Sequence, residues 1–248
     1  MNTNASHEAR PVILITGIGQ RAGYYLAEHY LQQGWLVIGT YRSERERLSS
    51  LRDQGALLFQ ADYQDEAATE QQVADIAAHL QHNALSLRAI IHNASDWEAE
   101  NPAQTDAGIL QRMMNIHARV PYLMNQALRP FFQQSFPQQG DIIHITDYVA
   151  ATGSAKHMAY AASKAAVENL TLSMAKLWAP DIKVNAIAPA LLEFNEGDGE
   201  AYKEKALRKN LIPSVGSFAL LAETIDFMMH NHYTTGRIVP LDGGRHLN

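Results

Sequence analysis

The sequence predicts an α/β protein with one doubly wound domain, in which helices flank a central parallel sheet of about seven strands. Short runs of β-branched and aliphatic residues recur at regular intervals along the 248 residues. Longer amphipathic segments separate these runs, and no linker rich in Pro, Gly or Ser divides the chain. Strands and helices that alternate in this way form parallel sheets with right-handed crossovers.

The expected strands are continuously apolar, which is typical of strands buried on both faces of a sheet. They cover 11–16, 35–41, 56–61, 88–93, 141–146, 182–188 and 236–241. The expected helices have apolar residues near helical spacing. They cover 22–33, 65–81, 108–134, 157–178 and 217–230.

Two segments stand outside this alternation. Residues 1–10 form a polar N-terminal tail, so the domain is expected over 11–248. Residues 190–216 follow a strand end and carry Gly, Pro and charged side chains. Because ligands of open α/β sheets bind beyond the carboxyl ends of the strands, we expect 190–216 to act as a substrate loop or lid.

Composition limits the classes of function. The net charge is −6 with Lys and Arg scattered, which argues against a nucleic-acid partner. There is no cysteine, and the eleven histidines show no HExxH or comparable ligand spacing, so no metal site is expected. The start of the chain lacks the apolar core of a signal peptide, and no apolar run approaches the ~18 residues of a membrane span. We therefore expect a cytoplasmic protein with no membrane partner.

A glycine-rich turn follows the first expected strand. It reads "TGIGQRAG" and places glycines at 17, 19 and 23 before a helix. Such a turn lets the backbone approach a pyrophosphate, and the helix N-terminus offers unpaired N–H groups and a favourable dipole. The turn therefore indicates a Rossmann-type dinucleotide site. Alternatively, the glycines serve only the turn itself.

The end of the second strand indicates which dinucleotide binds. Proteins that bind the ribose diol of NADH usually carry an acidic residue there. This chain instead reads "GTYRSERER", with Tyr41, Arg42 and Ser43 at that position. An arginine pairs with a 2′-phosphate by charge and forked donors, so NADPH is favoured. The alternative is that the arginines are the solvated start of a helix, which we accept for Arg45 and Arg47.

Tyr160 and Lys164 form a candidate catalytic pair. They are four residues apart, which places both side chains on one face of the expected helix. A free tyrosine has a pKa of about 10, and a nearby ammonium would lower the pKa of Tyr160. Tyr160 is therefore a candidate proton donor. Such a pair also occurs by chance, exposed on the surface of a helix.

The pair does not stand alone. Together with the glycine turn, "HNAS" at 92–95, "VNAIAP" at 184–189 and "TGRIVPLDGG" at 235–244, it makes the chain resemble the short-chain dehydrogenase/reductase family over 11–248. The resemblance implies that Tyr160 donates a proton and Lys164 holds the nicotinamide ribose. It also implies a homotetramer or homodimer, formed through helices near 110–130 and 157–178.

The resemblance also implies a set of residues that contact the cofactor, with Asp62 at the adenine and Pro189 near the nicotinamide. The full set is Gly17, Gln20, Arg21, Ala22, Tyr41, Arg42, Ser43, Asp62, Tyr63, Asn93, Ala94, Ser95, Tyr160, Lys164, Pro189 and Leu191.

Three departures from the family pattern narrow the branch. Arg21 stands where most members have glycine, Asp147 where they have serine, and His117 where they have asparagine. The first two changes resemble the pteridine reductases, as does an aromatic residue, Trp97, two positions after "NAS". Within that branch, "HNASDW", "ITDYV", "YAASKAA", "EFNE" and "PLDGGRHL" are similar to the bacterial dihydromonapterin reductases. That group uses NADPH and also reduces dihydrofolate weakly.

A pterin is a flat bicycle with an aminopyrimidinone edge, so its site needs a stacking surface and fixed hydrogen-bonding groups. Trp97 is expected to stack on the ring, with core packing as the alternative. Arg21 is expected to contact a phosphate and the carbonyl edge of the pterin, with a surface arginine as the alternative. Ser95 is expected to donate or accept at the aminopyrimidine edge. These are the expected substrate contacts, with Asp147 and Tyr160.

The expected reaction is reduction of the N5=C6 bond of a 7,8-dihydropterin, with the N5 proton coming from Tyr160, Asp147 or a water between them. Burial in apolar surroundings would let Asp147 keep a proton near neutral pH. His117 has two open interpretations. In one its imidazole holds a water of a proton relay behind Lys164, and in the other it is a packed helix histidine.

Two rival functions remain. A carbonyl reductase of the same fold, acting on 3-oxoacyl thioesters or sugars, would need a protonated Asp147, because a carboxylate repels a developing oxyanion. A non-catalytic NADPH or pterin sensor would not need the proton donor Tyr160.

Overall fold

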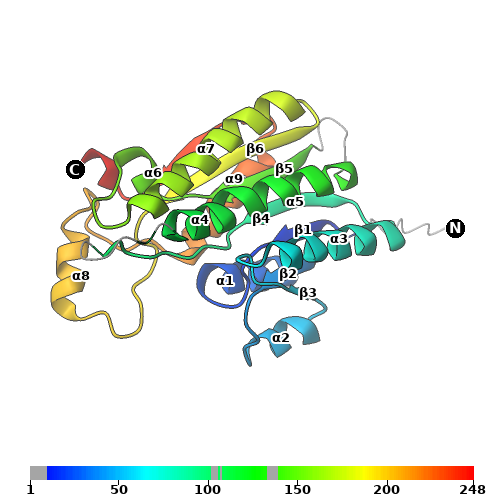
Figure 1. Cartoon of the computed structure of the whole chain (residues 1–248), viewed down its shortest axis with the longest axis horizontal. Helices are drawn as coiled ribbons and strands as arrows, with labels where there is room; N and C mark the ends of the chain where they lie inside the picture. The colour runs from blue at the N-terminus through cyan, green and yellow to red at the C-terminus, as the bar shows by residue number, and fades with distance from the viewer. Residues whose placement is uncertain (1–9, 102–105, 107, 133–138) are drawn as a thin grey trace, which may run out of the picture.

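The computed structural model describes residues 10–101, 106, 108–132 and 139–248. Seven parallel strands form one sheet in the order β3-β2-β1-β4-β5-β6-β7 (Figure 1). The strands are β1 (Val12–Ile15), β2 (Leu36–Tyr41), β3 (Leu57–Gln60), β4 (Leu87–His92), β5 (Gly140–Ile145), β6 (Ile182–Pro189) and β7 (Ile238–Leu241). The predicted fold class is confirmed. The strand order reverses between β1 and β4, which is where open α/β sheets bind their ligands.

Nine α-helices occur in the described residues. They are α1 (Arg21–Gln32), α2 (Leu48–Asp53), α3 (Glu66–His82), α4 (Gly108–Met114), α5 (Val120–Leu128), α6 (Val149–Thr152), α7 (Met158–Trp178), α8 (Glu200–Leu207) and α9 (Phe218–His230). Short 3-10 turns cover Arg129–Phe131 and Arg245–Leu247. The sequence reading missed α2, α6 and α8, because helices of eight residues or fewer carry little periodic signal. Helix α8 lies inside the irregular 190–216 segment.

The single helix expected over 108–134 was wrong. Helix α4 is followed by a π-helical segment, Asn115–Arg119, and then by α5. Pro121 has no N–H to donate to the carbonyl of His117 four residues earlier, which favours a wider turn at this point. Residues 133 and 134 of that expectation lie outside the described residues.

The continuous apolar character of the strands follows from helices on both faces of the sheet. On β1, Val12 and Leu14 pack into one hydrophobic cluster, with side chains of α3, α5 and α7. Ile13 and Ile15 pack into the other cluster, with side chains of α1, α2 and α9. Alternate residues therefore point to opposite, equally apolar layers, so the strand shows no polar alternation.

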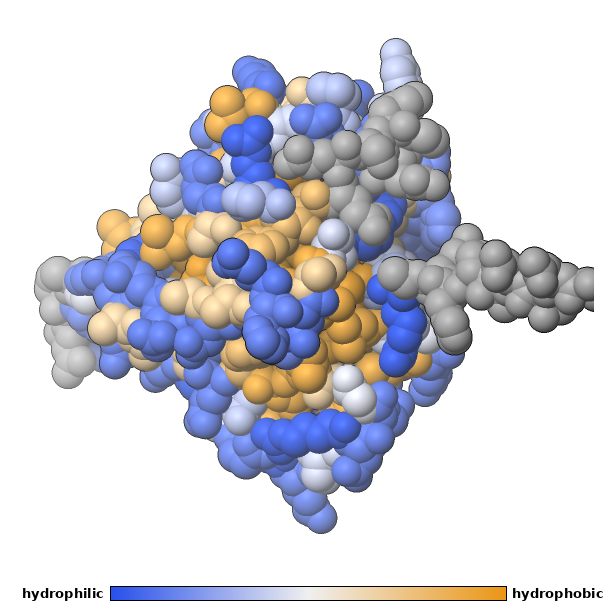
Figure 2. All heavy atoms as spheres, turned by 90° about the vertical axis from the view of Figure 1, so that its right-hand side faces the viewer, coloured by the Kyte–Doolittle hydropathy of each residue, from blue (hydrophilic) through white to orange (hydrophobic). Residues whose placement is uncertain are grey.

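The two ends of the sheet differ in character. The carboxyl ends of the strands lie toward the side of α6 and α8 (Figure 1). The opposite end of the molecule shows hydrophobic side chains around its middle, with hydrophilic ones around them (Figure 2). Within the described part of the chain, no helix is both long enough and apolar enough to cross a membrane.

Candidate active site

A cleft of about 440 Å³ opens at the carboxyl ends of β1, β2 and β4. Its lining includes most residues that were expected to contact the cofactor. These are Gly17, Gln20, Arg21, Ala22, Tyr41, Arg42, Ser43, Asp62, Tyr63, Asn93, Ala94 and Ser95, with Trp97 at one side. Arg45, expected to be only a solvated helix residue, lines the cleft as well.

Sterics require two of the three glycines in the first turn. Gly17 has a φ of +74°, and a Cβ there would lie 2.7 Å from the Cα of Ala94. A Cβ on Gly23 would lie 2.1 Å from the carbonyl oxygen of Gly17. The Asn93 amide closes the turn by donating to the carbonyl of Thr16 at 3.1 Å. Gly19 differs, because the nearest atom to its Cβ position is the Arg45 side chain at 3.8 Å. The space before Gly19 is open toward the cleft.

Arg21 adopts a backbone conformation that normally favours glycine. Its φ is +49°, in the left-handed region that costs a non-glycine residue roughly 1–2 kcal/mol. Its guanidinium donates to the carbonyl of Glu193 at 3.0 Å and to that of Phe194 at 3.5 Å. The side chain thus connects the glycine turn to the segment that was expected to act as a lid.

Arg42 lies at the end of β2, where the sequence suggested a 2′-phosphate site. Its side chain is 59% exposed and pairs with Asp96 at 2.9 Å. A phosphate at this site would therefore compete with the Asp96 carboxylate for the guanidinium. Ser43 is exposed beside Arg42 on the same cleft wall.

Tyr160 and Asp147 are in direct contact. The tyrosine hydroxyl donates to Asp147 Oδ2 at 3.0 Å, and the N–H of Val149 donates to Asp147 Oδ1 at 3.0 Å. Burial raises the pKa of Asp147 above its ordinary value. Burial and the neighbouring Asp147 carboxylate raise the pKa of Tyr160 well above 10.0. The expectation of a lowered Tyr160 pKa is wrong for this structure, because burial and Asp147 both raise it.

Lys164 is buried behind the tyrosine. Its ammonium donates to the carbonyl of Ile145 at 2.9 Å and lies 5.5 Å from the centre of the Tyr160 ring. Burial lowers the pKa of Lys164 to about 8, against the charges of Asp147 and Glu168, which raise it. Glu168 was not anticipated. It accepts from the Thr146 hydroxyl at 2.9 Å and adds a second carboxylate to this region.

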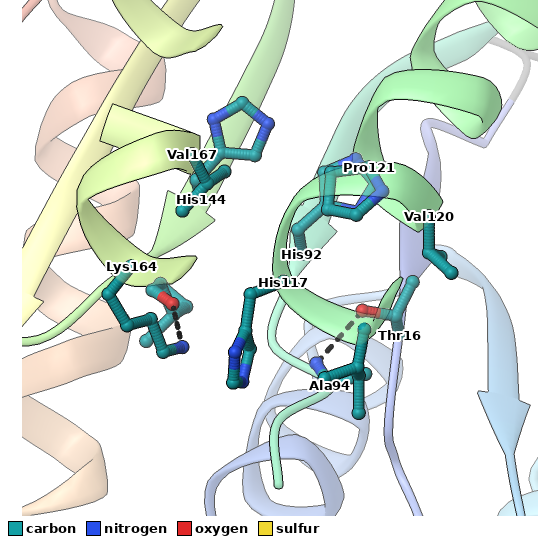
Figure 3. Close-up of a pocket in the computed structure, with 11 residues that line it drawn as sticks. Thr16, His92, Ala94, His117, Val120, Pro121, His144, Lys164 and Val167 are labelled. Carbon is teal, nitrogen blue, oxygen red and sulfur yellow. Dashed lines mark hydrogen bonds between the residues drawn. The ribbon is translucent and has the colours of Figure 1, made fainter. Parts of the chain in front are cut away.

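His117 lies in the π-helical segment and is 3% exposed. Its Nε2 is 2.8 Å from the hydroxyl of Ser95, and its Nδ1 is 2.8 Å from the hydroxyl of Ser163. The two serines occupy both ring nitrogens, so neither is left to hold a water. The imidazole borders a small cavity beside Lys164, with room for about one water molecule (Figure 3).

Trp97 lies on the exposed edge of the cleft rather than in the core. It is 63% exposed, and its ring meets that of His157 edge-on at 5.0 Å. The loop that carries Trp97 is tied to α7 by Glu100, whose carboxylate accepts from the N–H groups of Met158 at 2.8 Å and Ala159 at 2.6 Å. Glu100 therefore caps the helix that bears Tyr160. A cap supplied by a distant loop leaves no local signal in the sequence.

Four of the expected cofactor residues lie outside the lining of this cleft: Tyr160, Lys164, Pro189 and Leu191. Pro189 is buried at the end of β6, and its carbonyl accepts from the N–H of Tyr148 at 3.0 Å. The carbonyl of Leu191 accepts from the N–H of Gly216 at 3.0 Å. These contacts support the loop after β5 and close the base of the 190–216 segment.

Comparisons with known proteins agree with this arrangement. The family described as enoyl-(acyl carrier protein) reductase matches residues 17–246. A dihydromonapterin reductase from Klebsiella pneumoniae is 46% identical over 243 residues, which is 98% of this chain and 99% of that protein. The chain belongs to the short-chain dehydrogenase/reductase family. The family resemblance read from the sequence is confirmed, including the likeness to dihydromonapterin reductases.

Further relatives of this short-chain dehydrogenase/reductase support the same assignment. The dihydromonapterin reductase of Escherichia coli K12 is 44% identical over 235 residues, covering 95% of this chain and 96% of that protein. Among solved structures, FolM alternative dihydrofolate reductase 1 from Brucella canis, complexed with NADP, superposes with a TM-score of 0.80. That pair is 23% identical and covers 96% of this chain and 95% of the other, which shows a shared fold.

Proposed function

We propose that this chain is an NADPH-dependent reductase of 7,8-dihydropterins that converts dihydromonapterin to tetrahydromonapterin and reduces dihydrofolate weakly. The observation that carries the proposal is the direct contact of the Tyr160 hydroxyl with the Asp147 carboxylate at 3.0 Å. A carbonyl reductase would gain nothing from an anion beside a developing oxyanion, whereas a ring nitrogen that must be protonated gains a second acid. The 46% identity to a dihydromonapterin reductase supports the same substrate.

The cleft fits NADPH on three grounds. The backbone around Gly17 is too close to Ala94 for any side chain, while the space at Gly19 is open. The N-terminus of α1 offers N–H groups toward this space, as phosphate sites require. Arg42 is exposed at the far wall, where it would hold the 2′-phosphate. Lys164 would hold the nicotinamide ribose, as it does in the family. When bound, NADPH supplies the hydride.

The Asp147 carboxyl and the Tyr160 hydroxyl can move the proton that completes the reduction. Because burial raises the pKa of Asp147, that carboxyl can hold a proton closer to neutral pH than an ordinary aspartate. Tyr160 lies within hydrogen-bonding distance of Asp147 and can pass its own proton to the substrate while it accepts another from Asp147. Addition of a hydride at C6 and a proton at N5 then converts the C=N bond to C–N–H.

Trp97, Arg21 and Ser95 would bind the pterin. The exposed face of Trp97 offers a flat surface beside the cleft. Arg21 lines the same cleft, and its contacts to the carbonyls of Glu193 and Phe194 would close residues 190–216 over the substrate. Ser95 lines the cleft as well, and its hydroxyl lies 2.8 Å from Nε2 of His117.

The enzyme would work in the cytoplasm as a homotetramer or homodimer. Large apolar side chains that are exposed on α4, α5 and α7 support an assembly through these helices. They are Leu110, Tyr122, Met158, Leu172 and Leu177.

A comparison of substrates tests the proposed function. Purified protein is incubated with NADPH and either dihydromonapterin, dihydrofolate or acetoacetyl thioester, and the loss of NADPH absorbance is followed. We expect rapid turnover of dihydromonapterin, slow turnover of dihydrofolate and none of the thioester, with Tyr160→Phe as the inactive control. Turnover of the thioester alone would identify a carbonyl reductase, and binding of NADPH without any turnover would identify a sensor.

A further inference from the structure

The histidine that replaces the family asparagine is held between two hydroxyl groups. His117 comes from the π-helical segment, Ser163 from α7, and Ser95 from the loop after β4. Ser163 is buried, at 0% exposure, and Ser95 is exposed on the cleft. The imidazole therefore connects the interior of the catalytic helix to a hydroxyl at the expected substrate site. Figure 3 shows the ring between Lys164 and the strand ends.

The direction of each hydrogen bond in the series Tyr160–Ser163–His117–Ser95 can be deduced. The Ser163 hydroxyl donates its only hydrogen to the backbone carbonyl of Tyr160 at 2.7 Å, and that carbonyl can only accept. Ser163 must therefore accept from His117, which requires the hydrogen to be on Nδ1. A neutral imidazole then has a bare Nε2, which can only accept. The Ser95 hydroxyl must donate its hydrogen to that nitrogen.

The imidazole is kept neutral by its surroundings. Burial lowers the pKa of His117 well below 6.5, and the nearby Lys164 ammonium lowers it further. The imidazolium form, which would place a hydrogen on both nitrogens, is therefore disfavoured. The chain of hydrogen bonds has one direction near neutral pH.

We propose that His117 is a specificity-determining positioning residue, which fixes Ser95 as a hydrogen-bond acceptor toward the cleft. An acceptor there selects a substrate ring that carries an N–H donor at the same place. In a pterin this donor is the 2-amino group. A free serine hydroxyl turns to suit either a donor or an acceptor. With its hydrogen committed to Nε2, Ser95 presents only lone pairs to the cleft. A ring with a carbonyl oxygen at that position would meet an acceptor, and the unpaired contact would cost binding. This inference rests on the proposed function for the identity of the ring.

The tautomer is tested first, without any substrate. Nitrogen-15 NMR of histidine-labelled full-length protein, with and without NADP⁺, reports which ring nitrogen carries hydrogen. His117→Gln assigns the signal by its disappearance. We expect the hydrogen on Nδ1 from pH 6 to pH 8. A signal from the Nε2–H tautomer or from an imidazolium would overturn the proposal, whatever the enzyme reduces.

Substrate selectivity is tested next. Dihydromonapterin is compared with the matched dihydrolumazine, which has a 2-oxo group in place of the 2-amino group. We expect the wild-type enzyme to prefer the amino compound by ~10–100-fold in kcat/KM. This is the effect expected when a hydrogen bond between two neutral groups, enclosed in the complex, is lost. His117→Phe has a similar shape and leaves the Ser95 hydroxyl free to rotate. It should reduce the preference at least about fivefold, through the KM values rather than kcat.

Two variants separate this role from a structural one. His92→Phe makes the same substitution at another buried histidine that borders the same cavity and bonds to Asn125 rather than to Ser95. It should keep the wild-type preference. His117→Gln offers a carbonyl oxygen to Ser95 and an N–H to Ser163, so it should restore the preference lost in His117→Phe. Equal preferences in wild type and His117→Phe, or equal losses in His117→Phe and His92→Phe, would overturn the proposal. Failure of the wild type to reduce any pterin would instead contradict the proposed function.

Discussion

Two aspartates lie at opposite ends of β5 and have different neighbours. Asp141, near the start of the strand, is 0% exposed and contacts both Arg88 and Lys183, the latter at 3.0 Å. Asp147, just beyond the end of the strand, is half-buried and contacts the Tyr160 hydroxyl and the Val149 N–H. Burial raises the pKa of both carboxyls, but at Asp141 two cations in direct contact oppose it.

The difference separates a structural carboxylate from a reactive one. A buried anion that touches two cations is stabilised as a charge and fixes the elements that carry those cations. A buried carboxyl that lacks a cation in contact can hold a proton and release it. The amino end of the sheet therefore uses its aspartate for stability, and the carboxyl end uses its aspartate for chemistry.

The largest expected effect is on catalysis at Asp147. Asp147→Ser should lower kcat for dihydromonapterin by roughly 10²–10⁴-fold, because it removes the group that shares a proton with Tyr160. The Kd for NADPH, measured by fluorescence titration, should change less than about threefold, since Asp147 is not in the lining of the cofactor cleft. A large loss of NADPH affinity would mean that Asp147 organises the fold of the cleft instead.

The complementary change at the other end of β5 should act on stability. Asp141→Asn leaves Arg88 and Lys183 buried without their anion, so the free energy of unfolding should fall by ~3–5 kcal/mol. Urea denaturation measures this loss. The kcat of the remaining folded enzyme should stay near that of the wild type. An unfolding free energy equal to that of the wild type would contradict the stabilising role of Asp141.

The same contrast applies to the arginines. Arg88 is 16% exposed and committed to Asp141, whereas Arg42 is 59% exposed on the cleft and free to exchange Asp96 for a phosphate. Arg42→Ala should raise the KM for NADPH by about 10–100-fold, the value of a hydrogen-bonded charge pair. The KM for NADH should change little because NADH lacks the 2′-phosphate. Equal increases for the two cofactors would rule out this phosphate site.

The pH dependence of kcat/KM distinguishes the buried lysine of the active site, Lys164, from the buried lysine of the core, Lys183. Lys164 keeps its charge below a pKa of about 8 and becomes neutral as the pH rises through that value. Since kcat/KM reports the free enzyme, it should fall about tenfold for each pH unit above that point. Lys183, which pairs with Asp141, is remote from the cleft and should not affect the profile. A profile that stays flat to pH 10 would show that the Lys164 charge is not needed.

The smallest expected effect concerns Asp96. Asp96→Asn removes the carboxylate that competes with phosphate for Arg42, so the KM for NADPH should fall by about two- to fivefold. Arg42→Ala,Asp96→Asn should show no such gain over Arg42→Ala alone. If Asp96→Asn helps equally in both backgrounds, its effect does not pass through Arg42.

The sequence predicted the fold well because the strands are buried on both faces and their apolar runs are unmistakable. The seven strands and the longer helices α1, α3, α7 and α9 lie close to the expected ranges. The break in the 108–134 helix was missed because a π turn depends on tertiary contacts of His117, although Pro121 marks its position. Local spacing also could not reveal Glu100 as the cap of α7 or Ser163 as the partner of His117.

The sign of the Tyr160 pKa shift shows where residue spacing stops being informative. Spacing places Lys164 on the same helical face as Tyr160, which suggested a lowered pKa. In the structure the ammonium donates to Ile145, and Asp147 lies against the hydroxyl. Which charge touches the Tyr160 oxygen depends on side-chain directions from α7 and from the loop after β5, and these follow from the assembled fold.

The titration of the two aspartates tests the account most directly. Carboxyl carbon-13 NMR of aspartate-labelled protein, assigned with Asp147→Asn and Asp141→Asn, follows each group from acid to neutral pH. We expect Asp147 to titrate above the ordinary aspartate value of about 4, because burial raises its pKa. A carboxyl at position 147 that titrates at or below about 4 would contradict the central claim that this end of β5 keeps a proton for catalysis.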